Sequence, residues 1–278
     1  MAEHFDHCLG LLREGDRERY LTVLFAPAEK RPALAALFAF DLEISRIRDL
    51  VSEPMPGEIR LQWWRDAVSG ERDGEARQHP VGAALLDAIE HYRLPRGAFE
   101  NLLDARTFDL YHDPMPDRTA LEGYLGETVS AIFQMSAQIL ADGNDPKTAD
   151  AAGHAGVAYG IARLIRRLPH DRQQGRVLIP ADILAAAGTD SGAWLSGSDR
   201  DAAERAVSIV AELGRDHLSR AEEHVAGHAK TLRVAFLPLA VVSPVLERAT
   251  KAGAVAAETP VSLSPLRTQW RFMRRAIS

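Results

Sequence analysis

The sequence predicts an all-α protein, a single domain of stacked antiparallel helices. Nearly every segment spaces its apolar residues with a helical period, and no run alternates apolar with polar residues as a half-buried strand would. Pro32, Pro80, Pro95 and Pro146 each precede an apolar-periodic segment, where proline suits the first helical turn. No fixed repeat or shift in composition divides the chain, so one domain is expected over residues 1–278.

The first part of the chain predicts helices in quick succession. They are expected at 3–14, 17–25, 30–50, 57–70, 80–92 and 95–111, where apolar residues recur every three or four positions. Two short polar stretches containing proline are expected to be linkers: ERDGEARQHP at 71–80 and YHDPMPDR at 111–118.

The second part continues the same pattern. Helices are expected at 118–141, 146–168, 198–227, 230–249 and 261–276, with one short helix near 181–187 in an otherwise irregular stretch. GTDSGAWLSGSDRD at 188–201 predicts a third linker. Proline lacks a backbone donor, so Pro169 should kink the helix or end it near Leu168. Gly156 and Gly160, four residues apart, should let another helix approach closely.

Net charge, cysteine content and hydropathy exclude several classes of protein and of site. A net charge of −6 provides no overall basic field, so no nucleic-acid partner is expected. The single cysteine, Cys8, excludes an intramolecular disulfide and a multi-cysteine zinc site. The N-terminus is too charged for a signal peptide, and the apolar run at 234–246 is too short for a bilayer span. We expect a cytoplasmic protein with peripheral membrane contact at most.

Charged helix faces are the remaining candidates for a functional site. The chain has no GxxxxGK[ST] phosphate loop, no HExxH and no GxSxG. In FAFDLEISRIRDLVSEP, residues 38–54, Asp41, Ser45 and Asp49 recur every four residues and share one face. A carboxylate face of this kind could hold a metal, but serine occupies its middle. A metal site, a site that lost its metal and a solvated face all remain open.

A second charged segment is GVAYGIARLIRRLPHDRQQGRVLIP at 156–180. Arg163, Arg166 and Arg167 lie on an otherwise apolar helix, and Asp171 and Arg176 follow near its end. Arginine near a helix C-terminus interacts favourably with the helix dipole, by about 0.3–1 kcal/mol. Three arginines in five residues exceed what that interaction requires, so this segment is a candidate anion-binding site.

These segments resemble the signature regions of the squalene/phytoene synthase family. The likeness extends through RERYLTVLFAPAEKRPALAALFAF, HPVGAALLDAIEHYRLPRGAFENLLDARTFDL and GRVLIPADIL. The family consists of all-α isoprenoid synthases that join two prenyl diphosphates head to head. The resemblance therefore implies an isoprenoid-synthase-like bundle of antiparallel helices with a central cavity.

The chemical motifs depart from the family pattern. Only Asp49 keeps a carboxylate of the first aspartate-rich motif, and only Arg166 and Asp171 remain of the second. A magnesium cluster that holds diphosphate needs several oxygen ligands in near-octahedral array, which two carboxylates cannot supply. We therefore expect no metal site, no cofactor and no confident catalytic residue. If the protein is active, Asp49 and Asp171 are the candidates, with Mg²⁺ as cofactor.

The run FAFDLEISRIRDLVSEPMPGEIRLQWWRDAV, residues 38–68, is similar to a diverged branch of the family, the mitochondrial assembly factors of respiratory complex I. The residues that fit this branch are Glu43, Asp49, Val51, Ser52, Glu53, Gln62, Trp64 and Arg65. The branch is thought to keep the synthase fold without synthase activity. The resemblance thus implies a bacterial relative whose partners are complex I subunits or assembly intermediates.

Three hypotheses follow. The first is a non-catalytic synthase-fold protein in complex I assembly or maturation, located in the cytoplasm or peripherally at the inner membrane. The second is an active head-to-head prenyl transferase with an atypical metal site. The third, compatible with the first, is a binding protein for a prenyl diphosphate or lipid anion. The ligand or anion-binding candidates are Glu43, Asp49, Arg163, Arg166, Arg167, Asp171 and Arg176.

Three further expectations concern packing. Glu43 or Asp49 should pair with Arg163 or Arg167, because buried charges are rarely left alone. Adjacent helical residues point about 100° apart, so either Trp63 or Trp64 should be in the core and the other half-exposed. A basic helical face near the C-terminus is solvated or touches anionic lipid. Its residues are Arg267, Trp270, Arg271, Arg274 and Arg275.

Overall fold

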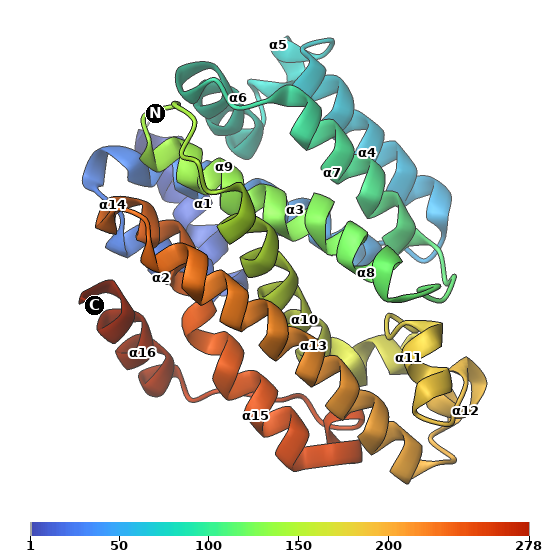
Figure 1. The fold of residues 1–278 in the computed structure, drawn as a ribbon. Helices are drawn as coiled ribbons and strands as arrows, with labels where there is room; N and C mark the ends of the chain where they lie inside the picture. Colours follow the sequence, from blue (N-terminus) through green and yellow to red (C-terminus); the bar gives the residue numbers. More distant parts are fainter. Residues whose placement is uncertain (1, 278) are drawn as a thin grey trace. The chain divides into compact units, whose positions relative to one another are not determined.

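A computed structural model describes residues 2–277, and these residues form helices and connecting turns with no strand (Figure 1). The all-α prediction is confirmed. The chain groups into two compact units, which are described separately. The first extends to Tyr111 and also contains residues 131–149 and 228–237; the second contains residues 112–130, 150–227 and the chain from Pro238 onward.

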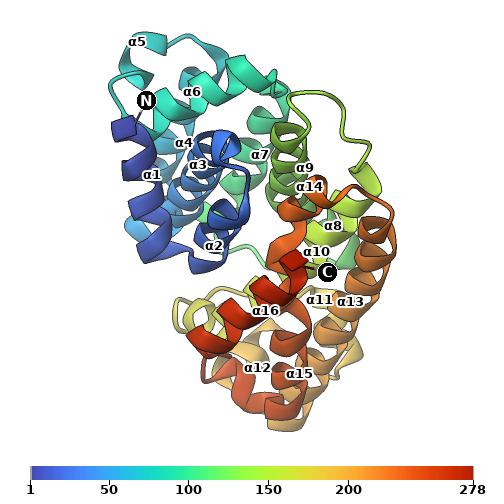
Figure 2. The same cartoon turned by 90° about the vertical axis from the view of Figure 1, so that its left-hand side faces the viewer.

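The first unit is organised around α3 (Arg31–Leu50), which contacts α1, α2, α4, α6, α7 and α9. Figure 2 shows α1 and α2 beside it. The α3 side chains are buried without interruption from Ala33 to Leu42, a run that is apolar except for Asp41. The other helices are α1 (Ala2–Gly15), α2 (Arg17–Phe25), α4 (Pro54–Ser69), α5 (Asp73–Ala76), α6 (Pro80–Tyr92), α7 (Arg96–Thr107), α9 (Ala131–Leu140) and α14 (Lys230–Arg233), with 3₁₀ turns η1 (Ala28–Lys30) and η2 (Phe108–Leu110).

The second unit is built on two long helices, α10 (Ala149–Gln173) and α13 (Arg200–Ala226). Helix α13 packs against α15, α11 and the turn η5, and Figure 1 shows α13 running beside α15. The remaining elements are α8 (Arg118–Leu125), the π-helical turn η3 (Gly126–Ser130), α11 (Ala181–Ala186), α12 (Ser191–Ser196), α15 (Val242–Ala252), η5 (Gly253–Ala257) and α16 (Pro265–Ile277). The 3₁₀ segment η4 (Val234–Val241) runs from the first unit into the second.

Of the two outcomes expected at Pro169, a kink or a helix end near Leu168, the end was wrong, because α10 continues through Pro169 to Gln173. A proline removes one backbone donor, and here that loss falls in the last turns of the helix. Leu168 and Asp171 are buried on either side of Pro169, and Gln174 still donates its backbone N–H to the His170 carbonyl at 3.1 Å. These interactions hold the final turn in place.

Two predicted linkers contain helices that were not expected, α5 within 71–80 and α12 within 188–201. Recognisable sequence signals mark both ends of α12. The Asp190 carboxylate caps it by accepting the Ala193 N–H at 2.8 Å, and Gly197 ends it with a left-handed φ of 70°. The linker at 111–118 is confirmed, since residues 112–117 are not helical.

The close approach expected at Gly156 and Gly160 is confirmed within the second unit. A Cβ atom on Gly156 would overlap the backbone of Ser130, and one on Gly160 would press into the Leu125 side chain. The Ser130 hydroxyl donates to the Gly153 carbonyl at 2.9 Å and closes the contact. Among the described residues, no helix combines the length and apolar character that crossing a bilayer requires.

Candidate functional site

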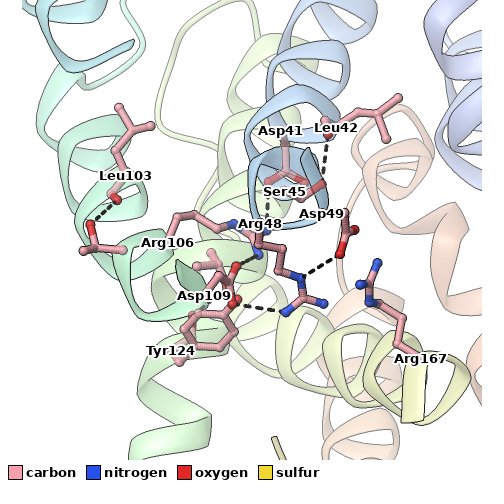
Figure 3. Close-up of polar contacts among 12 residues, drawn as sticks. Asp41, Leu42, Ser45, Arg48, Asp49, Leu103, Arg106, Asp109, Tyr124 and Arg167 are labelled. Carbon is pink, nitrogen blue, oxygen red and sulfur yellow. Dashed lines mark hydrogen bonds and ion pairs between the residues drawn. The ribbon is translucent and has the colours of Figure 1, made fainter. Parts of the chain in front are cut away.

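The charged face of α3 does not present three side chains to one ligand. Asp41 is fully buried, whereas Asp49 lies at the surface end of the helix, 4.0 Å from the Arg48 Nε (Figure 3). Between them, the Ser45 hydroxyl donates to the Leu42 carbonyl of its own helix at 3.0 Å. The middle position therefore satisfies its hydrogen bond locally, as serine often does within a helix.

Both carboxylate oxygens of Asp41 bind arginines. Oδ1 accepts from Arg106 Nη2 on α7 at 3.1 Å, and Oδ2 accepts from Arg19 Nη1 on α2. Arg19 is only 2% exposed, and Arg106 is also buried. Asp41 is therefore clamped by two guanidinium groups from two different helices.

The clamp extends into an alternating row of charges. Arg106 Nη1 donates to Asp109 Oδ2 at 3.2 Å, and Arg48 Nη1 donates to Asp109 Oδ1 at 3.3 Å (Figure 3). We call Arg19, Asp41, Arg48, Arg106 and Asp109 the arginine–aspartate network. All five residues are buried and come from α2, α3, α7 and η2. Charges removed from water in this way depend on one another, because losing one partner leaves a buried charge uncompensated.

The network does not fit a magnesium site on this face of α3. Mg²⁺ requires oxygen ligands in near-octahedral geometry, yet each Asp41 oxygen already accepts from a guanidinium group. A dication placed there would also be repelled by the arginines. At about 4 Å and an effective dielectric near 20, two unit charges interact by about 4 kcal/mol, and a dication would feel about twice that.

The arginine-rich segment of α10 forms contacts within the second unit. The Arg163 guanidinium lies over the Tyr159 ring at 5.8 Å, and Arg167 Nη2 is 3.3 Å from Asp171 Oδ1. The carboxylate of Asp171 is buried, and its backbone carbonyl accepts the Arg176 N–H at 2.8 Å. The structure therefore brings Arg167, Asp171 and Arg176 together. Arg166 lies half-buried on the same helix.

The expected ion pairing between α3 and α10 stays a prediction, because it joins groups that belong to the two separate units.

Glu43 lies on a different side of α3 from Asp49. The two residues are six positions apart on α3, which places their side chains about 120° apart around the helix.

Glu43 lines a pocket of about 470 Å³ between α3, α4 and α6. Trp63, Trp64 and His79 form its aromatic wall, with the two tryptophan rings in an edge contact at 4.9 Å. Trp64 is in the core and Trp63 is half-exposed, as the adjacent pair predicted. Arg46 and Arg60 complete the charged part of the lining.

Burial raises the pKa of Glu43 from 4.5 to about 7, because the carboxylate loses water. Burial, and secondarily the nearby His7, lowers the pKa of His79. His79 Nε2 lies 3.8 Å from Glu43 Oε2. The lowered pKa of His79 disfavours its charged form, and with it an ion pair between the two side chains.

Replacing Glu43 by glutamine should make the protein more stable at pH 8 but not at pH 4. Between pH 4.5 and about 7 the folded state keeps the Glu43 proton while the unfolded state releases it, so wild-type stability falls as pH rises. The difference between the folded-state and unfolded-state pKa values of Glu43 corresponds to a loss of about 3 kcal/mol, at most, in the free energy of unfolding of the wild type. Urea unfolding at both pH values measures it. Glu71→Gln, at an exposed glutamate, is the control, and an equal pH dependence in both variants would contradict the expectation.

Sequence reasoning missed Arg19, Arg48, Arg106 and Asp109 as members of a site. A signal for Arg106 was present, because Phe99, Leu102, Leu103 and Arg106 follow the spacing of one buried helix face. A charge on such a face indicates a buried partner. No comparable local signal identifies the partner, since Asp41 is 65 positions away.

The all-α fold, together with the charged segments of α3 and α10, indicates the family to which the chain belongs. A family model for squalene/phytoene synthase matches residues 12–274, and the chain belongs to that family. A solved dehydrosqualene synthase in complex with ligand has the same fold, with a TM-score of 0.80 at 15% identity, covering 99% of this chain and 95% of that one.

Within the family, the branch predicted from residues 38–68 is also confirmed. The chain is similar to NADH dehydrogenase (ubiquinone) complex I, assembly factor 6, of Homo sapiens, with 30% identity over 234 residues, 84% of this chain and 69% of the relative. The Bos taurus protein of that name is 32% identical over 215 residues, 77% of this chain. The chain covers 64% of the Bos taurus protein, slightly less than two thirds of its length.

Proposed function

We propose that this protein acts in the assembly or maturation of respiratory complex I and does not carry out prenyl transfer. The names of its relatives support the assembly role. The observation that carries the non-catalytic part is the clamping of Asp41 by Arg19 and Arg106. Asp41, one of the two carboxylates that metal binding on this α3 face would use, is neutralised by side chains of the same chain.

The chemical reason to expect no prenyl transfer is that this reaction requires the diphosphate leaving group to depart. Diphosphate departs readily when a bound metal ion acts as a Lewis acid and disperses the developing charge. Arginines can hold a diphosphate through charge-assisted hydrogen bonds, but they do not replace several metal ions. A chain that offers arginines on α10 to an anion, and whose Asp41 is held by the arginine–aspartate network, is therefore suited to binding anionic molecules without ionising them.

The assembly role includes a candidate ligand. Arg163, Arg166, Arg167 and Arg176 form the basic segment of the second unit, and we propose that they hold the anionic head of a prenyl diphosphate or a lipid. Complex I subunits or assembly intermediates are the proposed protein partners. The alternative is a head-to-head prenyl transferase that binds Mg²⁺ through Asp49 and Asp171.

Deleting the gene should lower the amount and activity of complex I in its host, with recovery when the wild-type chain is restored. Native gel electrophoresis and NADH:quinone oxidoreductase assays of isolated membranes measure both, with another respiratory complex as the internal control. Normal complex I content after deletion would refute the assembly role.

The purified protein with farnesyl or geranylgeranyl diphosphate and Mg²⁺ should release no diphosphate. An active synthase of the family, assayed in parallel, is the positive control. Turnover would refute the non-catalytic part of the proposal while leaving the assembly role to the deletion. Calorimetry with the same prenyl diphosphates, without metal, measures binding separately from chemistry.

A further inference from the structure

Helix α16 carries an apolar stripe that is open to solvent. Leu266, Trp270, Met273 and Ile277 are 77%, 53%, 48% and 72% exposed. Their spacing of four, three and four residues places all four side chains on one face of the helix. Single exposed apolar residues are common on proteins, but four aligned along a helix form a continuous surface that indicates a binding partner.

A row of arginines runs beside the stripe. Arg267, Arg271 and Arg274 each follow a stripe residue by one position, and all three are exposed. The Arg274 guanidinium lies 5.2 Å from the centre of the Trp270 ring. The segment 259–278 contains no aspartate or glutamate, although the whole chain has a net charge of −6. Positive charge is therefore concentrated at this helix.

The opposite face fixes the helix to the second unit. Thr268 and Phe272 are buried, and Arg275 makes a bidentate ion pair with Glu222 of α13 at 2.6 and 3.1 Å. These three positions lie about 180° around the helix from the stripe. The apolar stripe consequently faces away from the side by which α16 is held.

We propose that α16 lies flat on an anionic lipid bilayer. Leu266, Trp270, Met273 and Ile277 enter the boundary between head groups and acyl chains, where a tryptophan ring is especially well accommodated. The flanking arginines contact lipid phosphates and account for a preference for anionic lipid over neutral lipid. This surface contact is separate from the proposed assembly role and from the arginines of α10.

Flotation of the full-length protein with vesicles tests the proposal. The wild type should float with phosphatidylcholine vesicles that contain phosphatidylglycerol, more weakly with phosphatidylcholine alone, and less in high salt. Leu266→Ser combined with Trp270→Ser should lower the partition coefficient by about tenfold or more. Arg267→Glu combined with Arg271→Glu should abolish the preference for phosphatidylglycerol.

A matched control is available in the first unit. Met55 and Ile59 are 70% and 64% exposed on α4, so Met55→Ser with Ile59→Ser removes comparable apolar surface elsewhere. This variant should float like the wild type, and circular dichroism melting should show that every variant is folded. Quenching of tryptophan fluorescence by brominated lipid should be lost in Trp270→Phe.

Several results would overturn the proposal. They are no flotation with phosphatidylglycerol vesicles at low salt, flotation that persists after the stripe is substituted, and flotation that depends on Met55 and Ile59. A dimer in light scattering that dissociates in the Leu266→Ser, Trp270→Ser variant would instead assign the stripe to a second copy of the chain.

Discussion

Asp41→Asn is expected to lower the free energy of unfolding by about 3–5 kcal/mol. The substitution keeps the shape of the side chain but removes the negative charge that faces Arg19 and Arg106. Two guanidinium groups then remain inside the first unit with less compensation. Urea denaturation of the two proteins near pH 7 measures the difference. Ser45→Ala, one turn further along α3, removes only a bond within the helix and should change stability by about 0.5 kcal/mol or less.

A second variant separates the charge effect from packing. Replacing Arg19, Asp41 and Arg106 together by Met, Leu and Met removes both partners of the two Asp41 ion pairs, which is often close to neutral for a buried pair, and leaves Asp109 with Arg48 as its partner. This triple variant should recover most of the stability lost in Asp41→Asn. If Asp41→Asn costs less than about 1 kcal/mol, the buried charges are not interdependent and the account of the network is wrong.

Gly156→Ala is expected to destabilise the second unit by about 1–3 kcal/mol. The added methyl group would overlap the Ser130 backbone, which cannot move aside as easily as the end of a flexible side chain. The helix propensity of alanine offsets only about 1 kcal/mol of this cost. The expected readout is a lower midpoint in thermal or urea unfolding.

Gly153→Ala, one turn earlier on α10, is the matched control. A Cβ atom at Gly153 would meet nothing within 4 Å, so alanine there should be neutral or stabilising by up to about 1 kcal/mol. Equal unfolding midpoints for the two alanine variants would show that the contact between Gly156 and Ser130 is not tight in solution.

The sequence was sufficient for the architecture because helical periodicity is a local property. The α3, α6 and α13 segments were expected within about two residues of their observed ends. Short helices such as α5 were missed because they contain too few residues for a period to emerge. Pro169 misled the prediction because a proline near a helix end costs less than one in the middle.

The candidate site was predicted only in part, because its partners are far apart in sequence. The interrupted face of Asp41, Ser45 and Asp49 was visible as a pattern. The feature that makes this face a poor fit for Mg²⁺ is not local, since it depends on Arg19 and Arg106 reaching Asp41 from other helices. Glu43 was grouped with Asp49 by its charge, but it lines the pocket of Trp63 and His79 on another side of α3.

The arginine–aspartate network also constrains how this sequence can evolve. A metal-binding face on α3 would require a carboxylate at Ser45 and the release of Asp41 from its two arginines. Each change made alone introduces an uncompensated charge next to the network or leaves one inside it, and lowers stability before any metal could bind. Single substitutions that lead from this sequence toward such a face are therefore expected to pass through less stable intermediates.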